Sequence, residues 1–330
     1  MTALRLGTRG SALALAQARW AAERLGGSVE IVEITTAGDV DRAAGDKSRW
    51  TGALERALLD CEIDLAVHSA KDVPGELAEG TEIVAVPPRA DPRDVLVGVA
   101  SLDGLRRGAR VGTSALRRRA QLLAVRPDLE VVELRGNVDT RLRKLAAGEV
   151  DALVLAAAGL ARLGRDDVVA TALEGDVFVP APGQGFLAVQ ARTGGRFESV
   201  GDRRARADSV DAPDSPLDAI DDRFESVDDP RARANSVDAA GSPLVALDDP
   251  SARVLLTAER DLVARLGASC HTPVGAHARA TAAGIAIRAF VGLPDGSEWL
   301  IDEATDADVL AERLLSAGAA DLLARAEAMA

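Results

Sequence analysis

The chain is poor in aromatic residues, and this shortage argues against one class of function. Its 330 residues include no tyrosine, three tryptophans and five phenylalanines. So few aromatic rings leave little surface on which bases or sugars could stack. The formal net charge is −13, whereas proteins that bind nucleic acid usually present a basic surface. Both features argue against a nucleic-acid-binding protein.

Cysteine and long apolar runs are also scarce. The two cysteines, Cys61 and Cys270, are too few for a disulfide framework. The longest apolar run, 152–161, lies between charged residues and is too short to span a bilayer. The first twenty residues lack the succession of charged, apolar and small residues that marks a signal peptide. We therefore expect a soluble, cytoplasmic protein with no membrane partner.

Lysine is nearly absent, because all but three of the 39 basic residues are arginine. GC-rich codon usage alone would produce such a bias. Alternatively, some of the arginines form a site for anions, since a guanidinium binds carboxylate or phosphate as a bidentate fork. Composition leaves both interpretations open.

Strands and helices alternate through the first two thirds of the chain. Segments typical of strands lie at 4–9, 29–36, 64–69, 82–87, 94–100, 109–114, 130–135 and 151–159. Helical patterns separate them at 11–25, 51–59, 114–125 and 137–147. This alternation predicts an α/β fold with parallel or mixed sheets covered by helices. The Pro-rich, charged segment 87–94 reads as a connection between two lobes that would enclose a cleft.

The end of the chain has a different pattern. A helical stretch at 251–267 precedes a loop that contains Cys270, and alternating strands with a Pro-Asp-Gly turn at 294–296 follow. A closing helix is expected over 307–328. These features predict a small α+β C-terminal domain. The domain boundaries we expect are 1–88 with 183–195 for lobe 1, 89–182 for lobe 2 and 250–330 for the third domain.

A tandem repeat separates the lobes from the third domain. Residues 196–222 are followed directly by 223–249, and 20 of the 27 positions are identical in the two copies. Two copies that are rich in Asp, Arg and Ser and poor in core-forming residues do not make a solenoid. We expect 196–249 to be a disordered acidic insertion. A docking arm for a basic partner is the functional alternative.

Three strand ends lead into helix starts that carry arginine, at 8–11, 112–119 and 135–141. A helix N-terminus presents free N–H groups and the positive end of the helix dipole, so this recurrence favours a carboxylate or phosphate site. Ser11 and Asn137 have the residue type and position of N-caps. Ordinary capping beside solvated arginines is the alternative. The consecutive arginines 117–119 cannot all face one site, since successive helical residues diverge by about 100°.

The segment 67–75 holds the densest polar cluster at a strand end. His68, Ser69, Lys71 and Asp72 lie within five residues, and a proline follows two positions after the aspartate. A carboxylate there could accept N–H hydrogen bonds, move a proton or stabilise a cation. A capping aspartate beside a surface lysine is the alternative. The segment lacks the nucleophile elbow of a serine hydrolase.

Cys270 lies among small and polar residues, in the segment 267–273. Its thiol is therefore expected to be accessible, and His271 could assist its ionisation. The thiol would serve as a covalent attachment point or a nucleophile. A metal site built from Cys270, His271 and His277 matches no standard zinc spacing, and we expect no metal.

Taken together, these motifs resemble the hydroxymethylbilane synthases, also called porphobilinogen deaminases. The resemblance extends over nearly the whole chain through LGTRGSALALAQ, TTAGD, IDLAVHSAKDVP, DPRD, VGTSALRRRAQL, LRGNVDTRL, LAAAGLARLG, VPAPGQG and TAERDLVARLGASCHTPVGA. It implies a monomeric transferase with three domains, of which the first two are like the lobes of periplasmic binding proteins. It also implies that four porphobilinogen molecules are joined with loss of four ammonia molecules, and that hydrolysis releases hydroxymethylbilane.

The resemblance assigns a role to each cluster. It implies a dipyrromethane cofactor held by a thioether to Cys270, a growing polypyrrole chain, and Asp72 as the catalytic carboxylate. Because every pyrrole ring carries an acetate and a propionate, many cationic groups are needed. The implied cofactor-binding residues are Ser69, Lys71, Thr113, Ser114, Arg117, Arg118, Arg135, Gly136 and Gln184. The implied substrate-binding residues are Arg9, Ser11, Lys47, Arg141 and Arg162.

The chain departs from the family pattern at two places. The glycine-rich loop that usually follows TT-x-GD is replaced at 39–50 by DVDRAAGDKSRW, in which Lys47 stands for a family lysine. The repeat at 196–249 is absent from the usual pattern, and we expect it to be tolerated. Two alternatives stay open: a bilobed binding protein for a carboxylated ligand, and a Cys-dependent hydrolase that lacks a paired base.

Overall fold

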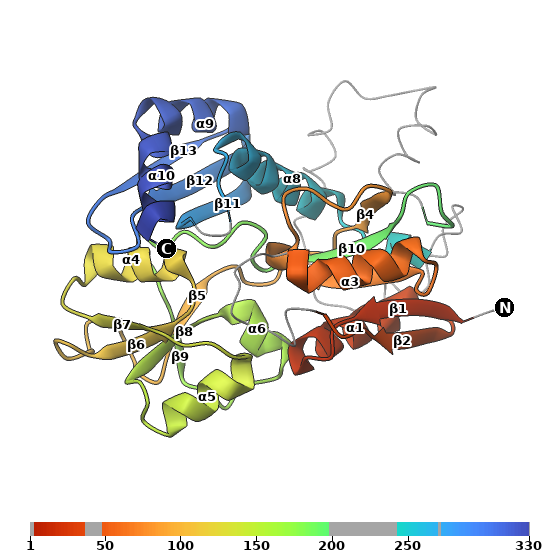
Figure 1. Ribbon diagram of the computed structural model, residues 1–330, viewed down its shortest axis with the longest axis horizontal. Coiled ribbons are helices and arrows are strands. Elements are labelled where there is room, and N and C mark those ends of the chain that lie inside the picture. Colours follow the sequence, from red (N-terminus) through yellow and green to blue (C-terminus); the bar gives the residue numbers. More distant parts are fainter. Residues whose placement is uncertain (1–2, 37–47, 198–242, 270–271, 330) are drawn as a thin grey trace.

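The computed structural model describes residues 3–36, 48–197, 243–269 and 272–329 (Figure 1). These residues form two lobes, each built on a five-stranded sheet, and a third unit built on a three-stranded sheet. The fold-class prediction of two mixed-sheet α/β lobes with a small C-terminal α+β domain is confirmed. Among the described helices, none is long and apolar enough to cross a membrane.

The first lobe carries a mixed sheet with the strand order β2-β1-β3-β10-β4. Its strands are β1 (Leu4–Thr8), β2 (Val29–Glu33), β3 (Leu65–Ser69), β4 (Thr81–Ala85) and β10 (Leu187–Arg192). β1 runs parallel to β2 and β3, whereas β10 returns from the second lobe and pairs antiparallel with β3 and β4. The return strand therefore ties the two halves of this lobe together.

Helices α1 (Ala12–Leu25) and α3 (Ser48–Leu59) cover opposite faces of this sheet. Successive side chains of β3 point to opposite faces, as the two-residue period of a strand requires. Val67 packs in the core cluster that includes residues of α1, whereas Ala66 packs with Leu54 and Leu58 of α3. The short 3₁₀ helix η1 (Ala70–Asp72) follows β3 directly.

The second lobe repeats the plan with the strand order β7-β6-β8-β5-β9. Its strands are β5 (Asp94–Val97), β6 (Arg110–Thr113), β7 (Glu130–Glu133), β8 (Ala152–Ala156) and β9 (Ala170–Ala172). Its helices are α4 (Leu116–Val125), α5 (Val138–Ala146) and α6 (Ala157–Arg162). β6 runs parallel to β7 and β8, and β5 runs antiparallel to β8 and β9. Because β10 belongs to the first sheet, the chain crosses between the lobes twice.

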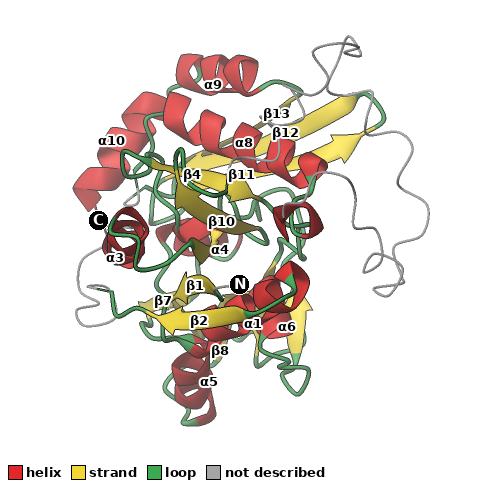
Figure 2. Cartoon of the chain, turned by 90° about the vertical axis from the view of Figure 1, so that its right-hand side faces the viewer, coloured by secondary structure: helices red, strands yellow, loops and turns green. Residues whose placement is uncertain are grey.

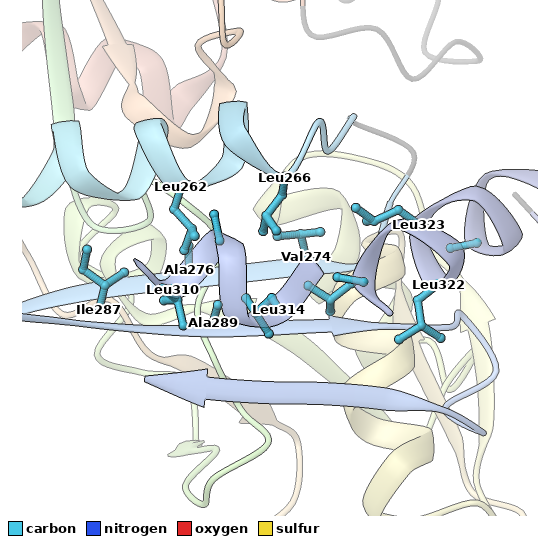
Figure 3. Close-up of a cluster of buried hydrophobic side chains, with 14 of the residues drawn as sticks. Leu262, Leu266, Val274, Ala276, Ile287, Ala289, Leu310, Leu314, Leu322 and Leu323 are labelled. Atoms are coloured by element: carbon cyan, nitrogen blue, oxygen red, sulfur yellow. The ribbon is translucent and has the colours of Figure 1, made fainter. Parts of the chain in front are cut away.

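The third unit is an antiparallel sheet with helices on one side (Figures 1 and 2). Its strands are β11 (Val274–Thr281), β12 (Gly284–Gly292) and β13 (Trp299–Ala304), and its helices are α8 (Pro250–Arg265), α9 (Ala307–Ser316) and α10 (Ala319–Met329). Leu262, Leu310 and Leu314 from the helices meet Ile287 of the sheet in one core (Figure 3). On the other face, Phe290 packs against Ala120 of α4 and Val179, which joins this domain to the second lobe.

Two predicted elements are divided in the structure. The strand expected over 151–159 ends at Ala156, and α6 begins at the next residue. The second half of that run is Ala-Ala-Gly-Leu-Ala without a β-branched residue, and alanine favours a helix. The helix expected over 307–328 breaks at Gly318, whose φ of +101° is a left-handed conformation that glycine tolerates and a helix does not contain.

The predicted insertion at 196–249 lies partly outside the described residues, which resume at 243. Its described ends are packed. Phe197 is buried in the core of the first lobe, and η2 (Pro243–Ala246) brings Leu244 and Leu247 into the same core. The apolar run Pro-Leu-Val-Ala-Leu at the end of the second copy provides these side chains. The prediction of disorder up to residue 249 is therefore wrong for the end of the second copy. The acidic composition of the surrounding segment made this short apolar run easy to overlook.

Candidate functional site

A small cavity of about 40 Å³ lies at the carboxyl ends of β1 and β3. Arg9 and Ser11 contribute to it from the start of α1, and Ser69 and Asp72 contribute from the end of β3 and from η1. In open α/β sheets, ligands commonly bind beyond the carboxyl ends of the strands. The structure thus brings four of the predicted site residues around one cavity.

The loop that carries Asp72 is held on three sides. Ser69 accepts a hydrogen bond of 2.8 Å from Nε2 of Gln17 on α1. The amide of Ala70 donates to the carbonyl of Phe186 in the returning chain, at 3.1 Å. From the third domain, Nη2 of Arg260 donates to the carbonyl oxygens of Pro74 and Gly75, at 2.9 and 2.8 Å. Contacts from distant parts of the chain therefore fix the position of this carboxylate.

Gly183 allows the returning chain to lie directly on this loop. Its φ is +75°, and a Cβ placed there would lie 2.9 Å from the carbonyl carbon of Ala70 and 2.9 Å from the amide nitrogen of Lys71. Any side chain would push the loop and the returning chain apart, so close packing beside Asp72 requires glycine.

Arg9 and Ser11 both line the cavity, and each has a contact within the first lobe. The guanidinium of Arg9 lies 4.0 Å from the centroid of the Trp50 ring, a cation–π contact. Ser11 caps α1 by accepting from the amide of Ala14 at 3.2 Å, and Asn137 caps α5 in the same way. The two predicted N-caps are confirmed.

A second cluster surrounds Asp94, at the start of β5. Its two carboxylate oxygens lie 2.6 Å from Nη1 of Arg117 and 2.8 Å from Nη2 of Arg118. Nε2 of Gln184 donates to the same carboxylate at 2.8 Å. Burial alone would raise the pKa of the Asp94 carboxyl, but the two guanidiniums outweigh it and hold that pKa well below its usual range.

This cluster assigns different environments to the three consecutive arginines. Arg117 and Arg118 are only 5% and 7% exposed, whereas Arg119 is exposed to solvent, as the helical geometry predicts. The two buried guanidiniums share one carboxylate, that of Asp94. The side chains of Asp94, Arg117 and Arg118 together therefore carry a net positive charge in the interior, between the second lobe and the returning chain.

Lys71 extends this positive region toward Asp72. Its ammonium lies 3.4 Å from Oε1 of Gln184, which in turn contacts Asp94. Burial and the charge of Arg118 lower the pKa of Lys71 to about 8. The surroundings thus disfavour the charged form of Lys71, and an anion placed beside its ammonium group would stabilise that form.

Arg141 and Arg162 are the clearest candidates for ligand binding in the second lobe. Arg141 donates to Ser114 at 2.7 Å and to the carbonyl of Gly136 at 2.9 Å, and Arg162 donates to the carbonyl of Gly185 at 2.6 Å. Burial lowers the pKa of each to about 10. Within the described part of the chain, neither guanidinium pairs with a carboxylate. These partly desolvated charges are suited to bind an anionic ligand.

The remaining predicted residues of the second lobe have local contacts. Thr113 is buried and accepts from the amide of Ala115 at 3.2 Å. Arg135 is exposed and pairs with Glu133 at 2.6 Å.

Two predicted residues, Lys47 and Cys270, lie outside the described residues. The chain on either side of 270–271 is anchored: Ser269 donates to Glu327 at 2.6 Å, and Thr272 donates to the carbonyl of Ser269 at 2.8 Å. Two residues after Val274 begins β11, the amide of Ala276 donates to the carbonyl of Pro180 at 2.9 Å. The neighbouring carbonyl of Val179 accepts from Arg117 at 2.8 Å. The start of β11 thus lies one residue away from the Asp94 cluster.

Glu259 joins the third domain to the lobes and was not among the residues predicted from the sequence. Its side chain is fully buried, lies 2.8 Å from Nη1 of Arg89, and accepts from the amides of Gly183 and Ala278 at 2.7 and 2.8 Å. A signal was present, because Glu259 interrupts the buried stripe of α8 that Leu256 and Leu262 continue. An acidic residue on such a stripe indicates a buried partner.

Comparison with known sequences identifies a family. A family model described as "Porphobilinogen deaminase, dipyromethane cofactor binding domain" matches residues 4–197, and one described as "Porphobilinogen deaminase, C-terminal domain" matches residues 254–319. A relative from Roseiflexus castenholzii named porphobilinogen deaminase is 42% identical over 97% of this chain and 98% of its own length. Another with that name, from Rubrobacter xylanophilus, is 43% identical over 96% of this chain and 95% of its own length.

Solved structures show weaker likeness. YhfZ from Shigella flexneri matches 80% of this chain and 96% of its own chain at 18% identity, with a TM-score of 0.33. An ancestral cationic amino acid solute binding protein matches 58% of this chain and 83% of its own chain at 17% identity, with a TM-score of 0.35. The fold described above rests on its own strands and helices.

Proposed function

The chain belongs to the porphobilinogen deaminase family, and from this premise we propose that Asp72 is the carboxylate that acts on the substrate. In this family a dipyrromethane primer is extended by four porphobilinogen units, each joined with loss of ammonia, and hydrolysis frees hydroxymethylbilane. The observation that supports our proposal is the position of Asp72. It lines a cavity at a strand end and directly follows the cation Lys71, while the second lobe carries the partly buried cations Arg141 and Arg162.

The charges of the described residues fit the dipyrromethane group. Every ring brings two carboxylates, and the buried guanidiniums of Arg117 and Arg118 share a single carboxylate, that of Asp94. When bound, the group supplies the pyrrole carbon to which the first substrate ring is joined. We propose that Cys270 holds it by a thioether, because the anchored start of β11 lies beside the Asp94 cluster. The residues proposed to hold its carboxylates and rings are Ser69, Lys71, Thr113, Ser114, Arg117, Arg118, Arg135, Gly136 and Gln184.

Asp72 would stabilise positive charge on the substrate ring. When ammonia leaves porphobilinogen, the electron pair of the carbon–nitrogen bond leaves with the nitrogen, and the pyrrole ring becomes electron-deficient. A carboxylate that accepts the pyrrole N–H stabilises this charge more in the transition state than in the ground state. The same carboxylate can accept a proton when the joined ring regains its aromatic form.

Cations on both lobes would hold the acetate and propionate groups of the incoming ring. We propose Arg9, Ser11, Lys47, Arg141 and Arg162 for this role. Arg9 is positioned by the ring of Trp50, and Arg141 by Ser114 and Gly136. Guanidiniums fixed in this way lose less side-chain entropy when they bind a carboxylate.

The test is turnover of porphobilinogen by the purified protein and by Asp72→Asn. Wild type should release four ammonia molecules for each hydroxymethylbilane, and Asp72→Asn should lose most of this turnover. Glu76→Gln is the matched control, because Glu76 is an exposed acidic residue four positions further along the same loop. Equal turnover in wild type and Asp72→Asn would reject the role of Asp72.

A bilobed binding protein that performs no chemistry is the alternative function, and no contact in the structure favours it. Release of ammonia from porphobilinogen would exclude it. Monomeric state and cytoplasmic location are also part of our proposal. Sedimentation of the purified protein and fractionation of the source cells test these two points.

A further inference from the structure

A buried amide lies between the cation that precedes Asp72 and the carboxylate of the second lobe. The side chain of Gln184 is fully buried. Its Oε1 lies 3.4 Å from Nζ of Lys71, and its Nε2 donates to Asp94 at 2.8 Å and to the carbonyl of Pro92 at 2.7 Å. Because two acceptors lie at the nitrogen and an ammonium lies at the oxygen, only this orientation of the amide satisfies all of its neighbours.

Two glycines allow the backbone of Gln184 to lie close to both lobes. Gly183 has a φ of +75° and lies against the backbone of Lys71 in the first lobe. Gly185 has a φ of +90°, and its carbonyl accepts from the amide of Ala90, in the segment that crosses to the second lobe, at 3.1 Å. The residue between these glycines therefore reaches a side chain of each lobe.

The carboxylate of Asp94 is already occupied by other donors. Its Oδ2 accepts from Nη1 of Arg117 at 2.6 Å, and its Oδ1 accepts from Nε of Arg118 at 3.0 Å as well as from Gln184. Lys71 receives the oxygen of the amide instead of a share of this carboxylate. An amide oxygen accepts a hydrogen bond from an ammonium but does not neutralise its charge. The positive charge of Lys71 is thus kept.

Lys71 and Asp72 are neighbours in sequence, but their side chains lie in different places. A 3₁₀ helix has three residues per turn, so adjacent side chains on η1 diverge by about 120°. Asp72 lines the cavity at the end of β3, whereas the ammonium of Lys71 contacts Gln184. An ion pair between Lys71 and Asp72 would occupy both the carboxylate and the cation that the proposed function requires.

We propose that Gln184 is a positioning residue, whose amide holds the ammonium of Lys71 apart from the protein's own carboxylates and so keeps it available for a carboxylate of the pyrrole chain. This inference rests on the proposed function. The two carboxylates are those of Asp94 and Asp72. An ion pair with either of them would leave this ammonium with little attraction for a ligand, since its charge would already be compensated inside the protein.

The charges around Lys71 provide a signature for this separation. Burial disfavours its charged form, and so do the guanidiniums of Arg118 and Arg117 on α4. Asp72 on η1 and Asp94 on β5 favour that form. The balance lowers the pKa of Lys71 to about 8. Direct pairing with either carboxylate would raise this pKa.

The first test is the titration of Lys71 in the full-length protein. The chain has three lysines, Lys47, Lys71 and Lys144, so NMR of ¹³C-labelled lysine side chains gives three signals, and Lys71→Arg identifies one of them. The measurement uses Cys270→Ala, whose intact mass shows whether dipyrromethane is absent. We expect a pKa of about 8 for Lys71 in this protein. Gln184→Met should raise it to about 9 or higher, because the released ammonium pairs with a carboxylate.

A role in packing alone predicts the opposite shift. Loss of the amide oxygen without a new ion pair would lower the pKa of Lys71, so a pKa that falls or stays at about 8 in Gln184→Met would overturn the inference. Gln121→Met is the matched control. Gln121 is also fully buried, accepts from Arg117 at 2.9 Å and donates to the carbonyl of Val179 at 2.8 Å. Its substitution should leave the titration of Lys71 unchanged.

Kinetics of the holoenzyme test whether Gln184 acts through Lys71, with rates expressed per cofactor-bearing molecule as counted by intact mass. Gln184→Met should lower kcat/KM for porphobilinogen about tenfold, the value of one lost hydrogen bond to a charged group. In a Lys71→Met background no ammonium remains to be held, and the same substitution should lower kcat/KM less than about twofold. Equal losses in the two backgrounds would overturn the inference.

A second variant keeps the inference testable if Gln184→Met does not fold. Gln184→Glu preserves the size of the side chain and pairs with Lys71 directly, so it should lower kcat/KM at least as much. Activity equal to wild type in Gln184→Glu would overturn the inference. Failure of wild type to release ammonia would instead overturn the proposed function.

Discussion

Nη1 of Arg117 lies 2.6 Å from Oδ2 of Asp94, and both side chains are almost fully buried. Arg118 binds the other oxygen of the same carboxylate. Asp94→Asn would leave two buried guanidiniums without an anion. Removing one partner of a buried ion pair costs about 3–5 kcal/mol, so we expect the free energy of unfolding to fall by at least about 3 kcal/mol. Urea denaturation measures this change.

Asp91→Asn is the control for that experiment. Asp91 also pairs with an arginine, Arg93, but both side chains are exposed. Exposed ion pairs contribute about 0–1 kcal/mol. A loss of similar size in both variants would show that burial of the Asp94 cluster is unimportant for stability.

The buried imidazole of His68 predicts a loss of stability in mild acid. Its pKa is lowered to about 4 in the folded protein, from an ordinary value of about 6.5. Between these two pH values the unfolded chain binds a proton on this imidazole and the folded protein does not. Stability therefore decreases as the pH falls from about 6.5 to about 4. This term amounts to at most about 3 kcal/mol. His277 has a similarly lowered pKa and adds to the same slope.

The measurement is the free energy of unfolding of wild type and His68→Gln at several pH values between 7.5 and 4.5. The variant should have a shallower slope, and His68→Gln combined with His277→Gln should be shallower again. Identical slopes in wild type and the double variant would contradict the assignment of buried, neutral imidazoles.

Glu259 predicts how strongly the third domain is joined to the lobes. Glu259→Ala would remove the partner of Arg89 and the acceptor of two backbone amides, so we expect a loss of about 3 kcal/mol or more in unfolding free energy. Glu312→Ala, at an exposed position on α9, is the control and should change stability by less than about 0.5 kcal/mol. Comparable losses in the two variants would contradict a joining role for Glu259.

Gly183 and Gly194 form a matched pair for testing the loop that carries Asp72. Both have positive φ, at +75° and +64°. An added Cβ at Gly183 would meet the backbone of Ala70 and Lys71, whereas an added Cβ at Gly194 would have no neighbouring atom of the described residues within 4 Å. Gly183→Ala should therefore displace the carboxylate and lower turnover by about tenfold or more, since misplacement by 1 Å can cost about a hundredfold. Gly194→Ala should lower stability without lowering turnover. Equal turnover in the two variants would show that this close packing does not position Asp72.

The order of the main elements could be predicted from the sequence because the apolar periodicity is local. The lobes and the third domain follow from it, whereas the return of the chain near residue 183 was implied by the resemblance to the family. The boundary between strand and helix inside 151–159 could not be predicted, because a run of alanine and leucine is compatible with both a buried strand and a buried helix. The packed residues Leu244 and Leu247 were hidden by the acidic composition around them.

The candidate site was predicted in part. Asp72 and the N-cap Ser11 lie at strand ends and helix starts, which sequence motifs mark directly. The pairing of Asp94 with Arg117 depends on how β5 and α4 pack, and no local pattern encodes that. For the same reason, Thr51 and His68 meet at one cavity only after α3 is laid on the sheet.

The most direct test of our central claim is the intact mass of the purified protein before and after incubation with porphobilinogen. We predict that wild type exceeds its sequence mass by one dipyrromethane and gains further pyrrole units on incubation. Cys270→Ala should lack the initial excess, and Asp72→Asn should carry it without gaining units at the wild-type rate. A wild-type protein that has its bare sequence mass and still forms hydroxymethylbilane would contradict the claim.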